Sequence, residues 1–315
     1  ISAIGFLNYN LKDYIYDHIR FKPNLNQVPL FWFVKPKKIF KYKIDDSKHK
    51  KQKNNLCHLS KDILDIKEYR KIINTIKKEL YNGNVYQINM TMPKFYQLNL
   101  NSLLYYLEMR NVAKPKSGYY INLGGKQILS FSPETFFTIQ NQNIKTYPMK
   151  GTIERSANAI QDLVLKKNLE NSKKDLAEHL MIVDLMRNDL GKICQFGTIN
   201  VKDLFKVNSY ETVHQMESCV YGKLESNISF SNIIKALFPG GSVTGAPKES
   251  AMKIIDHLEN YSRDIYSGSI GYIKNNSMNF NIAIRTMIIE DSLAKYPIGG
   301  GIVWDSDYQS EWNEA

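Results

Sequence analysis

Hydrophobic positions along the chain follow two periods, and each period predicts a different kind of element. In residues 65–80 apolar side chains recur every three or four positions, which predicts an amphipathic helix. A Ser or Asp followed three residues later by an acidic residue marks the start of a helix. This pattern occurs at Asp65 and at Ser172, and it predicts a second helix over 172–190. A short helix is predicted near 229–237. Runs rich in aromatic and β-branched residues predict strands, namely GFLNYN, FWFV, VYQINMTMPKFYQL, GYYINLG, QILSFSPETFFTI, NIKTYPMKGT, GTINVKDLFKV and SYETVHQMESCVYGKL.

The C-terminal part reads as three strands joined by short polar turns. These runs are YSGSIGYI, SMNFNIAIRTMIIE and YPIGGGIVW, and together they predict an antiparallel meander. Strands that follow one another as hairpins, with helices in separate blocks, favour the α+β class over an alternating parallel fold. A length of 315 residues with 43% hydrophobic residues suits one large domain, or two intimately packed lobes, spanning residues 1–315.

The positive charge is concentrated in one segment. The formal net charge is +11, but Lys35–Lys53 carries nine lysines and two aspartates and so accounts for +7 of it. We interpret residues 35–55 as a solvated lysine-rich loop. A nucleic-acid-binding arm is the alternative, yet no groove-reading module accompanies the run, and we expect no nucleic-acid partner.

Cysteine use and hydropathy indicate the compartment. Three cysteines, Cys57, Cys194 and Cys219, are widely spaced and predict neither a disulfide framework nor a zinc site. No apolar run approaches the roughly 20 residues of a membrane span. We therefore expect a cytoplasmic protein without a membrane partner. The chain begins at Ile1 without Met and stops at Ala315 within a motif, so we expect residues to be missing at both ends.

Two stretches have the composition of binding sites. The loop PGGSVTGAPK, residues 239–248, precedes a predicted helix, and glycine backbone N–H groups with a helix N-terminus suit a carboxylate or phosphate. A simple glycine-rich turn is the alternative. The apolar helix 172–190 carries Glu178 and Asp184, which need partners if the helix is buried. A metal site and an internal salt-bridge network both satisfy that need.

Two further features concern carboxylate chemistry. Alternation along SMNFNIAIRTMII places Arg285 on the more polar face of a strand, where its guanidinium could hold a carboxylate or face solvent. Glu311 and Glu314 are three residues apart, which places both carboxylates on one side of a helix. Oxygen ligands favour Mg²⁺ over zinc, although such a pair usually faces solvent.

Taken together, these stretches resemble the chorismate-utilising enzymes, which include anthranilate, aminodeoxychorismate, isochorismate and salicylate synthases. The matching segments run in family order over the whole chain. They are GFLNYN, GNVYQINMT, SFSPETFF, YPMKGTIER, DLAEHLMIVDLMRNDLG, FPGGSVTGAPKESAMKII, YSGSIGY, NIAIRTM and GGGIVWDSDYQSEWNEA. The resemblance implies a two-lobed α+β fold with large antiparallel sheets packed face to face, helices outside and a Mg²⁺-dependent chorismate site.

The resemblance also implies roles for individual residues. Glu178 and Glu314 look like magnesium ligands, with Glu311 close by and acting through water. The residues that look like the cradle for the substrate carboxylates, or like substrate-binding neighbours, are Ser242, Gly245, Tyr266, Arg285, Gly299, Gly300, Gly301, Thr152 and Gln215.

Lys150 separates the subfamilies. Several of them resemble one another in having alanine at this place, whereas aminodeoxychorismate synthases with lysine read P-I-K-G-T, and this chain reads PMKGT at 148–152. The implied chemistry is that neutral Lys150 attacks C2 of chorismate as the C4 hydroxyl leaves, and ammonia then adds at C4 and expels the lysine. Glu134 looks like the acid that protonates the hydroxyl. An exposed lysine has a pKa of about 10.4, so we expect Lys150 to be recessed near Glu134 with a lowered pKa.

Two departures from the family pattern are visible. Where many relatives carry a catalytic-site histidine, this chain has Gln215, and His214 lies one residue earlier. Strand alternation predicts that His214 points to the opposite face. Little precedes GFLNYN, the place where relatives form a tryptophan pocket, so we expect no tryptophan feedback.

We expect an aminodeoxychorismate synthase component I that uses ammonia from a separate glutamine amidotransferase subunit, because none of the cysteines has a nucleophile-elbow context. Anthranilate synthase component I and a catalytically inactive scaffold subunit are the alternatives.

Overall fold

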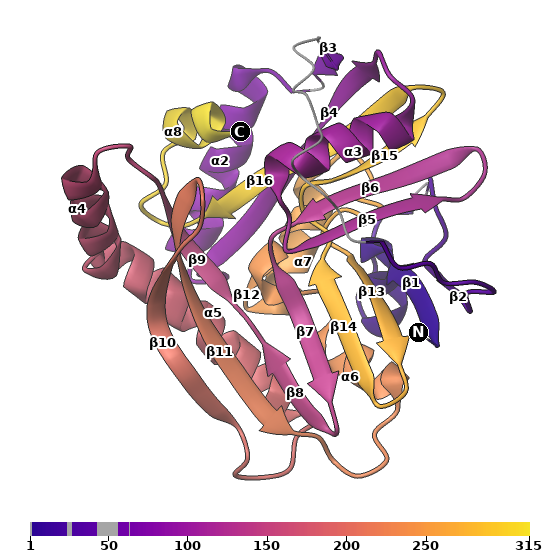
Figure 1. Cartoon of the computed structure of the whole chain (residues 1–315). Helices are drawn as coiled ribbons and strands as arrows, with labels where there is room; N and C mark the ends of the chain where they lie inside the picture. Colours follow the sequence, from indigo (N-terminus) through magenta and orange to yellow (C-terminus); the bar gives the residue numbers. More distant parts are fainter. Residues whose placement is uncertain (1, 24–26, 43–55, 63) are drawn as a thin grey trace.

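Two antiparallel sheets form the body of the protein, with helices on their outer faces (Figure 1). The computed structural model describes residues 2–23, 27–42, 56–62 and 64–315. Within these ranges one sheet has nine strands and the other seven. The predicted α+β class is therefore confirmed, and part of the core lies between the sheets, where Phe6 and Ile270 of the first contact Ile128 and Ile288 of the second.

The nine-stranded sheet provides one half of the molecule. Its order is β10 (Asn200–Ser209), β11 (Val213–Lys223), β8 (Asn143–Thr146), β7 (Thr135–Gln140), β14 (Ser277–Ile282), β13 (Ser269–Lys274), β1 (Ala3–Leu7) and β2 (Phe31–Val34), and β9 (Met149–Glu154) pairs with β11. Between β1 and β2 the chain forms two short helices, η1 (Tyr9–Leu11) and α1 (Lys12–Ile15). The buried face packs on α5 (Lys173–Gly191) and α6 (Phe230–Leu237) through aromatic and aliphatic side chains.

The seven-stranded sheet is covered by helices at two places. Its order is β12 (Gly245–Ala246), β4 (Gln87–Leu98), β16 (Leu293–Ile302), β15 (Thr286–Glu290), β6 (Lys126–Ser132) and β5 (Ser117–Asn122), and β3 (Cys57–Asp62) pairs with β4. The helices around it are α2 (Ile66–Tyr81), α7 (Lys248–Leu258) and α8 (Tyr308–Glu314) on β4 and β16, and α3 (Ser102–Ala113) on β5 and β6. Alternation along β6 puts Ile128 into the layer between the sheets and Leu129 under α3.

The predicted helix starts are confirmed by their caps. The side chain of Asp65 accepts a hydrogen bond from the Glu68 amide, and that of Ser172 accepts one from the Asp175 amide. Ser229 caps α6 in the same way.

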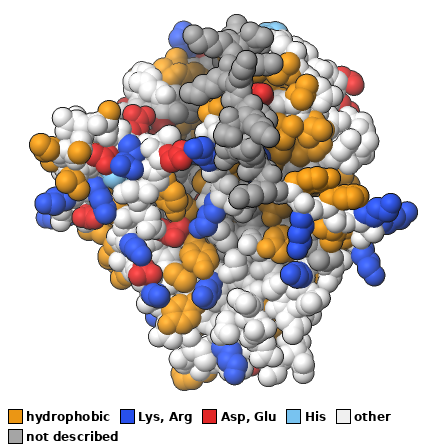
Figure 2. Space-filling view, in the orientation of Figure 1, with side chains coloured by type: hydrophobic (Ala, Val, Ile, Leu, Met, Phe, Trp, Pro, Cys, Tyr) orange, Lys and Arg blue, Asp and Glu red, His pale blue; other side chains and the backbone are white. Residues whose placement is uncertain are grey.

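Neither α3 nor α4 (Ala159–Glu170) was predicted from the sequence. Both leave apolar side chains in solvent, among them Ile160, Leu163 and Val164 of α4, so their pattern lacks one apolar stripe. Figure 2 shows apolar side chains on the surface of the projecting α4 and basic side chains spread over the same face of the molecule.

The predicted C-terminal meander is wrong at its second strand. The run SMNFNIAIRTMIIE is divided, because β14 ends at Ile282 in the nine-stranded sheet and β15 begins at Thr286 in the seven-stranded sheet. Arg285 lies in the connection with φ +49°, in the left-handed region that a continuous strand excludes. The alternation argument for Arg285 therefore fails, because it assumed one uninterrupted strand.

Part of the lysine-rich segment can be compared with its prediction. Residues 35–42 belong to no helix or strand, and most are exposed, whereas residues 43–55 lie outside the described residues. In the part of the chain that the structure describes, no helix is long and apolar enough to cross a membrane.

Candidate active site

The candidate site lies where the chain crosses twice between the two sheets. Glu134 occupies the connection from β6 to β7, and Arg285 occupies the connection from β14 to β15. The two crossings are joined by backbone hydrogen bonds, from the Phe131 amide to the Arg285 carbonyl (3.0 Å) and from the Ile282 amide to the Glu134 carbonyl (3.1 Å). Residues about 150 positions apart thus meet at one place.

A cavity of about 320 Å³ opens at these crossings. Its lining comprises Asn89, Glu134, Met149, Lys150, Ser242, Val243, Tyr266, Ile284, Arg285, Tyr296, Pro297, Ile298 and Gly299. Lys150, Glu134, Ser242, Tyr266, Arg285 and Gly299 are all residues that the sequence predicted for one site. A mixture of cationic, acidic and hydroxyl groups in a partly apolar hollow suits a small polar ligand.

Lys150 is directed by a β-bulge. It is the second residue of β9 and pairs with Met216 of β11, and the register shifts at the next residue, Gly151. Gly151 has φ +68°, which a side chain would disfavour, and a Cβ there would lie 2.9 Å from the Leu169 side chain. A bulge bends a strand and redirects the neighbouring side chain, so the Lys-Gly sequence explains how the amine enters the cavity.

The Lys150 amine is half-buried and forms no ion pair with any residue that the structure describes. Burial lowers the pKa of Lys150 below its usual 10.5, and the carboxylates of Glu178, Glu134, Glu311 and Glu314 oppose that change. Because burial has the larger effect, the neutral amine is favoured relative to an exposed lysine. The expected recessed position and lowered pKa both agree with the structure.

Glu134 has the properties of a proton donor. Burial raises the pKa of Glu134 to about 7, against a hydrogen bond from Ser242 and the charge of Lys150, which both lower it. The Ser242 hydroxyl donates to Oε1 of Glu134 at 2.7 Å. A carboxyl group with a pKa close to neutral can exist in both protonation states, which a group that first gives and later takes a proton requires.

The glycine run of β16 forms another wall. A Cβ on Gly301 would lie 3.0 Å from Nζ of Lys150 and 2.8 Å from Nε2 of Gln87, whereas a Cβ on Gly300 would meet only Oε2 of Glu311 at 3.5 Å. Gly301 therefore leaves space for the two nitrogen-bearing side chains.

Gln87 is a site residue that sequence reasoning missed. It is fully buried, and both its Oε1 and its Nε2 lack a hydrogen-bond partner among the described residues. An unsatisfied buried amide is unfavourable, so this side chain has unused hydrogen-bonding capacity close to Lys150, behind the cavity wall. Its only signal was its place within the predicted strand VYQINMTMPKFYQL, and no rule of spacing distinguishes it there.

The glycine-rich loop contributes its first half to the site. Ser242 and Val243 line the cavity, whereas Gly245 pairs with Ile88 as part of β12. The N-terminus of α7 that follows contributes no residue to the lining, and the amine of its first residue, Lys248, donates to Asp189 at 2.6 Å. The expectation that this N-terminus would add donors to the site is not supported by the lining.

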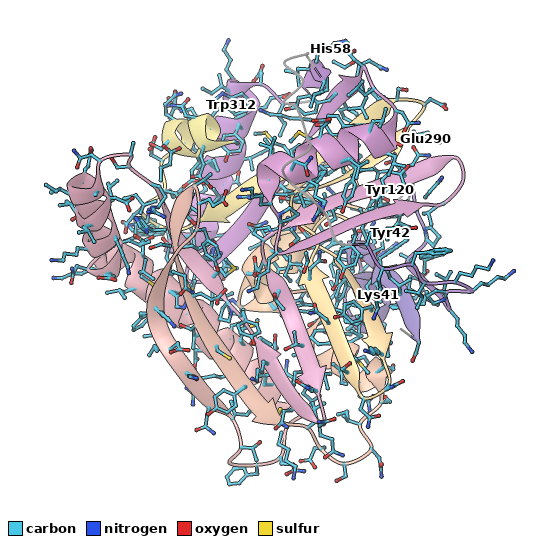
Figure 3. The ribbon with its side chains drawn as sticks, in the orientation of Figure 1. Lys41, Tyr42, His58, Tyr120, Glu290 and Trp312 are labelled. Carbon is cyan, nitrogen blue, oxygen red and sulfur yellow. The ribbon has the colours of Figure 1, made fainter. Side chains whose placement is uncertain are left out.

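Glu178, Glu311 and Glu314 face the same region from two helices. All three influence Lys150 electrostatically, Glu178 from α5 and the other two from α8. Helix α8 is held in place by Trp312, labelled in Figure 3, whose ring lies 5.4 Å from that of Tyr69 on α2.

The three carboxylates provide the oxygen donors that magnesium prefers, but they are not gathered around one position. Burial raises the pKa of Glu178, and the charge of Glu311 adds to this, so the acidic groups repel one another in a way that a cation would relieve. Among the described residues, however, no three His, Cys, Asp or Glu side chains are close enough to hold one metal ion. The oxygen donors are of the kind that suits Mg²⁺, but in this structure they do not surround one common position.

Gln215 and Thr152 lie beside the main cavity. The Gln215 amide donates to the Thr152 hydroxyl at 3.3 Å, and Gln215 lines a neighbouring hollow that shares Met149 and Arg285 with the cavity. They are therefore at the edge of the site.

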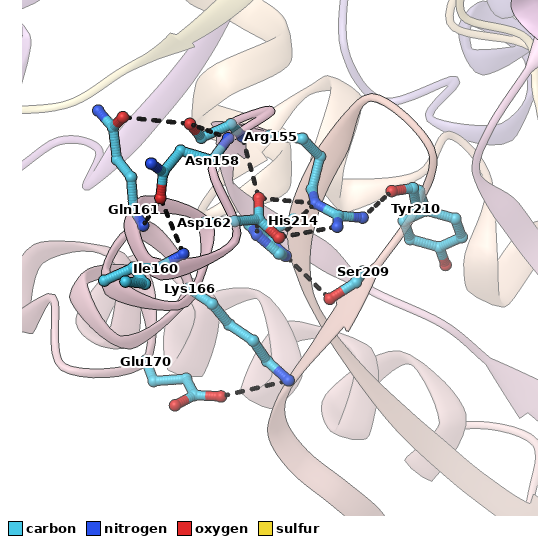
Figure 4. A network of polar contacts seen from close by, with 11 residues as sticks. Arg155, Asn158, Ile160, Gln161, Asp162, Lys166, Glu170, Ser209, Tyr210 and His214 are labelled. Carbon is cyan, nitrogen blue, oxygen red and sulfur yellow. Dashed lines mark hydrogen bonds and ion pairs between the residues drawn. The ribbon is translucent and has the colours of Figure 1, made fainter.

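His214 points the other way, as alternation predicts. It is buried, and its ring nitrogens contact Ser209 at 2.9 Å and Asp162 at 3.0 Å (Figure 4). Asp162 also accepts a two-fold hydrogen bond from Arg155, which lowers the pKa of that carboxyl. This network ties α4 to the β10–β11 turn and takes no part in the cavity.

Comparison with known proteins identifies the family of this chain. The family described as chorismate binding enzyme matches residues 1–315. The chain belongs to this family. Among curated members, it is 38% identical over 248 residues to anthranilate synthase component 1 of Saccharolobus solfataricus, covering 78% of this chain and 59% of that one. It is 37% identical over 249 residues to aminodeoxychorismate synthase component 1 of Klebsiella aerogenes, covering 79% and 55%.

Structural comparison supports the same family. The fold matches anthranilate synthase component I from Streptococcus pneumoniae with a TM-score of 0.84 and 26% identity, over 99% of this chain and 78% of that one. The chain spans somewhat more than half the length of the two curated chorismate binding enzymes above. Both anthranilate and aminodeoxychorismate synthases are thus among its relatives.

Proposed function

We propose that this chain is the ammonia-using component I of an aminodeoxychorismate synthase, which converts chorismate to 4-amino-4-deoxychorismate. The observation that carries the proposal is Lys150, a half-buried amine at a β-bulge with a lowered pKa, in the same cavity as Glu134. Such an amine is suited to nucleophilic attack. Relatives named aminodeoxychorismate synthase component 1 support the assignment at the level of the family.

The reaction needs two balanced steps. Neutral Lys150 forms a bond to C2 of the ring, the double bonds shift, and the C4–O bond breaks while protonated Glu134 gives its proton to the departing hydroxyl, which leaves as water. Ammonia then forms a bond to C4, the double bonds shift back and the C2–N bond breaks, which returns Lys150 as a neutral amine. The Glu134 carboxylate removes the extra proton from the new ammonium group and is ready for another turnover.

Arg285 and the loop at Ser242 would bind the substrate carboxylates, because a guanidinium and backbone N–H groups are the natural donors at this cavity. In the same proposal Mg²⁺ would be held by Glu178 and Glu314, with Glu311 acting through water, and would supply positive charge to the ring carboxylate.

Ammonia would come from a glutamine amidotransferase partner. The names of the relatives as component 1 agree with a second component. We also propose that the chain acts in p-aminobenzoate and folate biosynthesis, because its proposed product is 4-amino-4-deoxychorismate.

Anthranilate synthase component I is the second candidate, and the relative from S. solfataricus favours it. The two are separated by incubating the protein with chorismate, Mg²⁺ and ammonium and identifying the products by mass spectrometry. We expect 4-amino-4-deoxychorismate from the wild type, no product from Lys150→Ala and normal product from Lys145→Ala, an exposed lysine on β8.

Other outcomes decide against the proposal. Anthranilate and pyruvate released without an added lyase would assign the chain to the second candidate. No product with any ammonia supply, together with normal binding of an amidotransferase, would indicate an inactive scaffold.

A further inference from the structure

Arg263 is the largest fully buried side chain in the described part of the protein, and the chemistry above does not use it. It lies in the connection between α7 and β13 and is 2% exposed. Its guanidinium forms a two-fold pair with Glu259, from Nε at 2.8 Å and from Nη2 at 2.7 Å. The ring of Tyr9 lies 4.7 Å from its central carbon. Such a cation needs partners on every side.

The remaining donors of Arg263 reach three separate segments. Nη1 donates to the carbonyl of Val243 at 2.8 Å and to the hydroxyl of Ser267 at 3.2 Å, and Nη2 donates to the carbonyl of Asn89 at 2.7 Å. The Arg263 carbonyl in turn accepts from the Tyr266 amide at 3.0 Å. All five N–H groups of a guanidinium are thereby used.

These segments are walls of the active-site cavity. Val243, Asn89 and Tyr266 line it, and Arg263 lies behind them. Asn89 also pairs in register with Gly301, the glycine that leaves room for Lys150. One side chain thus holds the serine loop, the tyrosine segment and the strand beside the glycine run.

Glu259 extends the same clamp along β4. Its Oε1 accepts from the backbone amide and from the hydroxyl of Thr91, at 2.9 and 2.7 Å. Thr91 pairs in register with Gly299, another residue of the cavity wall. The carboxylate therefore fixes β4 two residues beyond the contact that Arg263 makes.

We propose that Arg263 and Glu259 form a positioning clamp that sets the distance between the Ser242–Val243 loop, Tyr266 and β4, and so shapes the chorismate-binding cavity. This inference rests on the proposed function for its substrate, but the clamp itself does not touch the ligand. Lysine cannot replace arginine in it, because one ammonium group cannot reach carbonyls on two segments and a two-fold carboxylate partner together.

The main test is Arg263→Lys, assayed with chorismate, Mg²⁺ and ammonium. We expect KM for chorismate to rise about tenfold or more while kcat stays within about threefold, because the loss falls on binding geometry. Amide hydrogen exchange should quicken in 87–91, 241–245 and 265–268, and stay unchanged in α4.

A matched control separates positioning from stability. Lys248→Met removes another buried cation, whose bonds to Asp189 and to the Leu237 carbonyl join no residue of the cavity lining. We expect it to lower the melting temperature without changing KM. If Arg263→Lys behaves in the same way, with KM unchanged and exchange faster throughout the protein, the clamp is only structural and the inference is overturned.

Two further readouts keep the test decisive. If Arg263→Lys does not fold, Glu259→Gln carries the same measurements, since it weakens the pair but retains the shape. If the wild type converts no chorismate, the proposed function fails, and the local exchange pattern alone decides whether the clamp exists.

Discussion

Removing the Ser242 hydroxyl should shift the alkaline limit of catalysis to higher pH. Ser242 donates to Glu134 at 2.7 Å. Burial raises the pKa of Glu134 to about 7, and the bond from Ser242 is the largest of the interactions that oppose this increase. A hydrogen bond to a charged group contributes about 1.5–3 kcal/mol. Since one pKa unit corresponds to about 1.4 kcal/mol, Ser242→Ala should raise the pKa of Glu134 by roughly one unit or more.

The assay follows from the role of Glu134 as acid. Only the protonated form can give a proton to the leaving hydroxyl, so the fraction of wild-type enzyme with Glu134 able to act as the acid should fall as pH rises through 7. Ser242→Ala keeps the proton to higher pH, so its rate relative to the wild type should increase by about fivefold between pH 7 and pH 9 for a shift of one unit. Free ammonia varies equally for both proteins, which makes the ratio the proper readout.

Ser242→Thr is the control, because it retains a hydroxyl and should keep a nearly constant ratio. A ratio for Ser242→Ala that is flat or falls with pH would refute the reasoning, since Glu134 would then not be the acid or the bond would not stabilise its charge. Stability provides an independent check. The folded pKa of about 7 exceeds the ordinary 4.5, so this carboxyl stabilises the fold fully below pH 4.5 and loses about 3 kcal/mol as pH rises through 7. Glu134→Gln should remove that dependence in pH-resolved denaturant titrations.

Three other changes have definite outcomes. Gly301→Ala should reduce kcat more than tenfold because its Cβ would press on Lys150, whereas Gly300→Ala, with 3.5 Å to its nearest neighbour, should keep nearly normal kcat in the same steady-state assay. Gln87→Met should raise the free energy of unfolding by about 1–3 kcal/mol in urea titrations, by removing an unsatisfied buried amide, and lower kcat/KM; lower stability would contradict the hydrogen-bond accounting. Asp162→Asn should lower the melting temperature at neutral pH but less at acid pH, because a depressed carboxyl pKa contributes stability that is lost as pH falls; an equal decrease at both pH values would argue against the ion-paired network.

Features set by neighbours along the chain could be predicted from sequence. The caps at Asp65 and Ser172 depend on a side chain and an amide three residues away, and both were predicted. The opposite orientations of His214 and Gln215 follow from strand alternation alone. Lys150 was predicted from a short motif, and its bulge depends on the glycine beside it.

Features set by tertiary packing could not. Arg285 belongs to a crossing between sheets, and period-two alternation cannot show where a strand leaves its sheet. Arg263 is important because of partners such as Asn89, which is 174 residues away in the chain. Gln87 is important because its amide has no hydrogen-bond partner among the described residues. The inward turn of Lys248 was missed for the same reason, because it depends on Asp189 of α5.

The position of the site explains why so much of the chain is needed to build it. Lys150 comes from β9 in the nine-stranded sheet, whereas the glycine run beside it comes from β16 in the seven-stranded sheet. Glu134 lies on a crossing that belongs to neither sheet. A small rotation of one sheet against the other would therefore change the distances between nucleophile, acid and cradle together. Behind the cavity, Arg263 joins Asn89 of β4 to Ser267 in the turn before β13, so the shape of the site depends on buried polar contacts behind it as much as on the side chains in it.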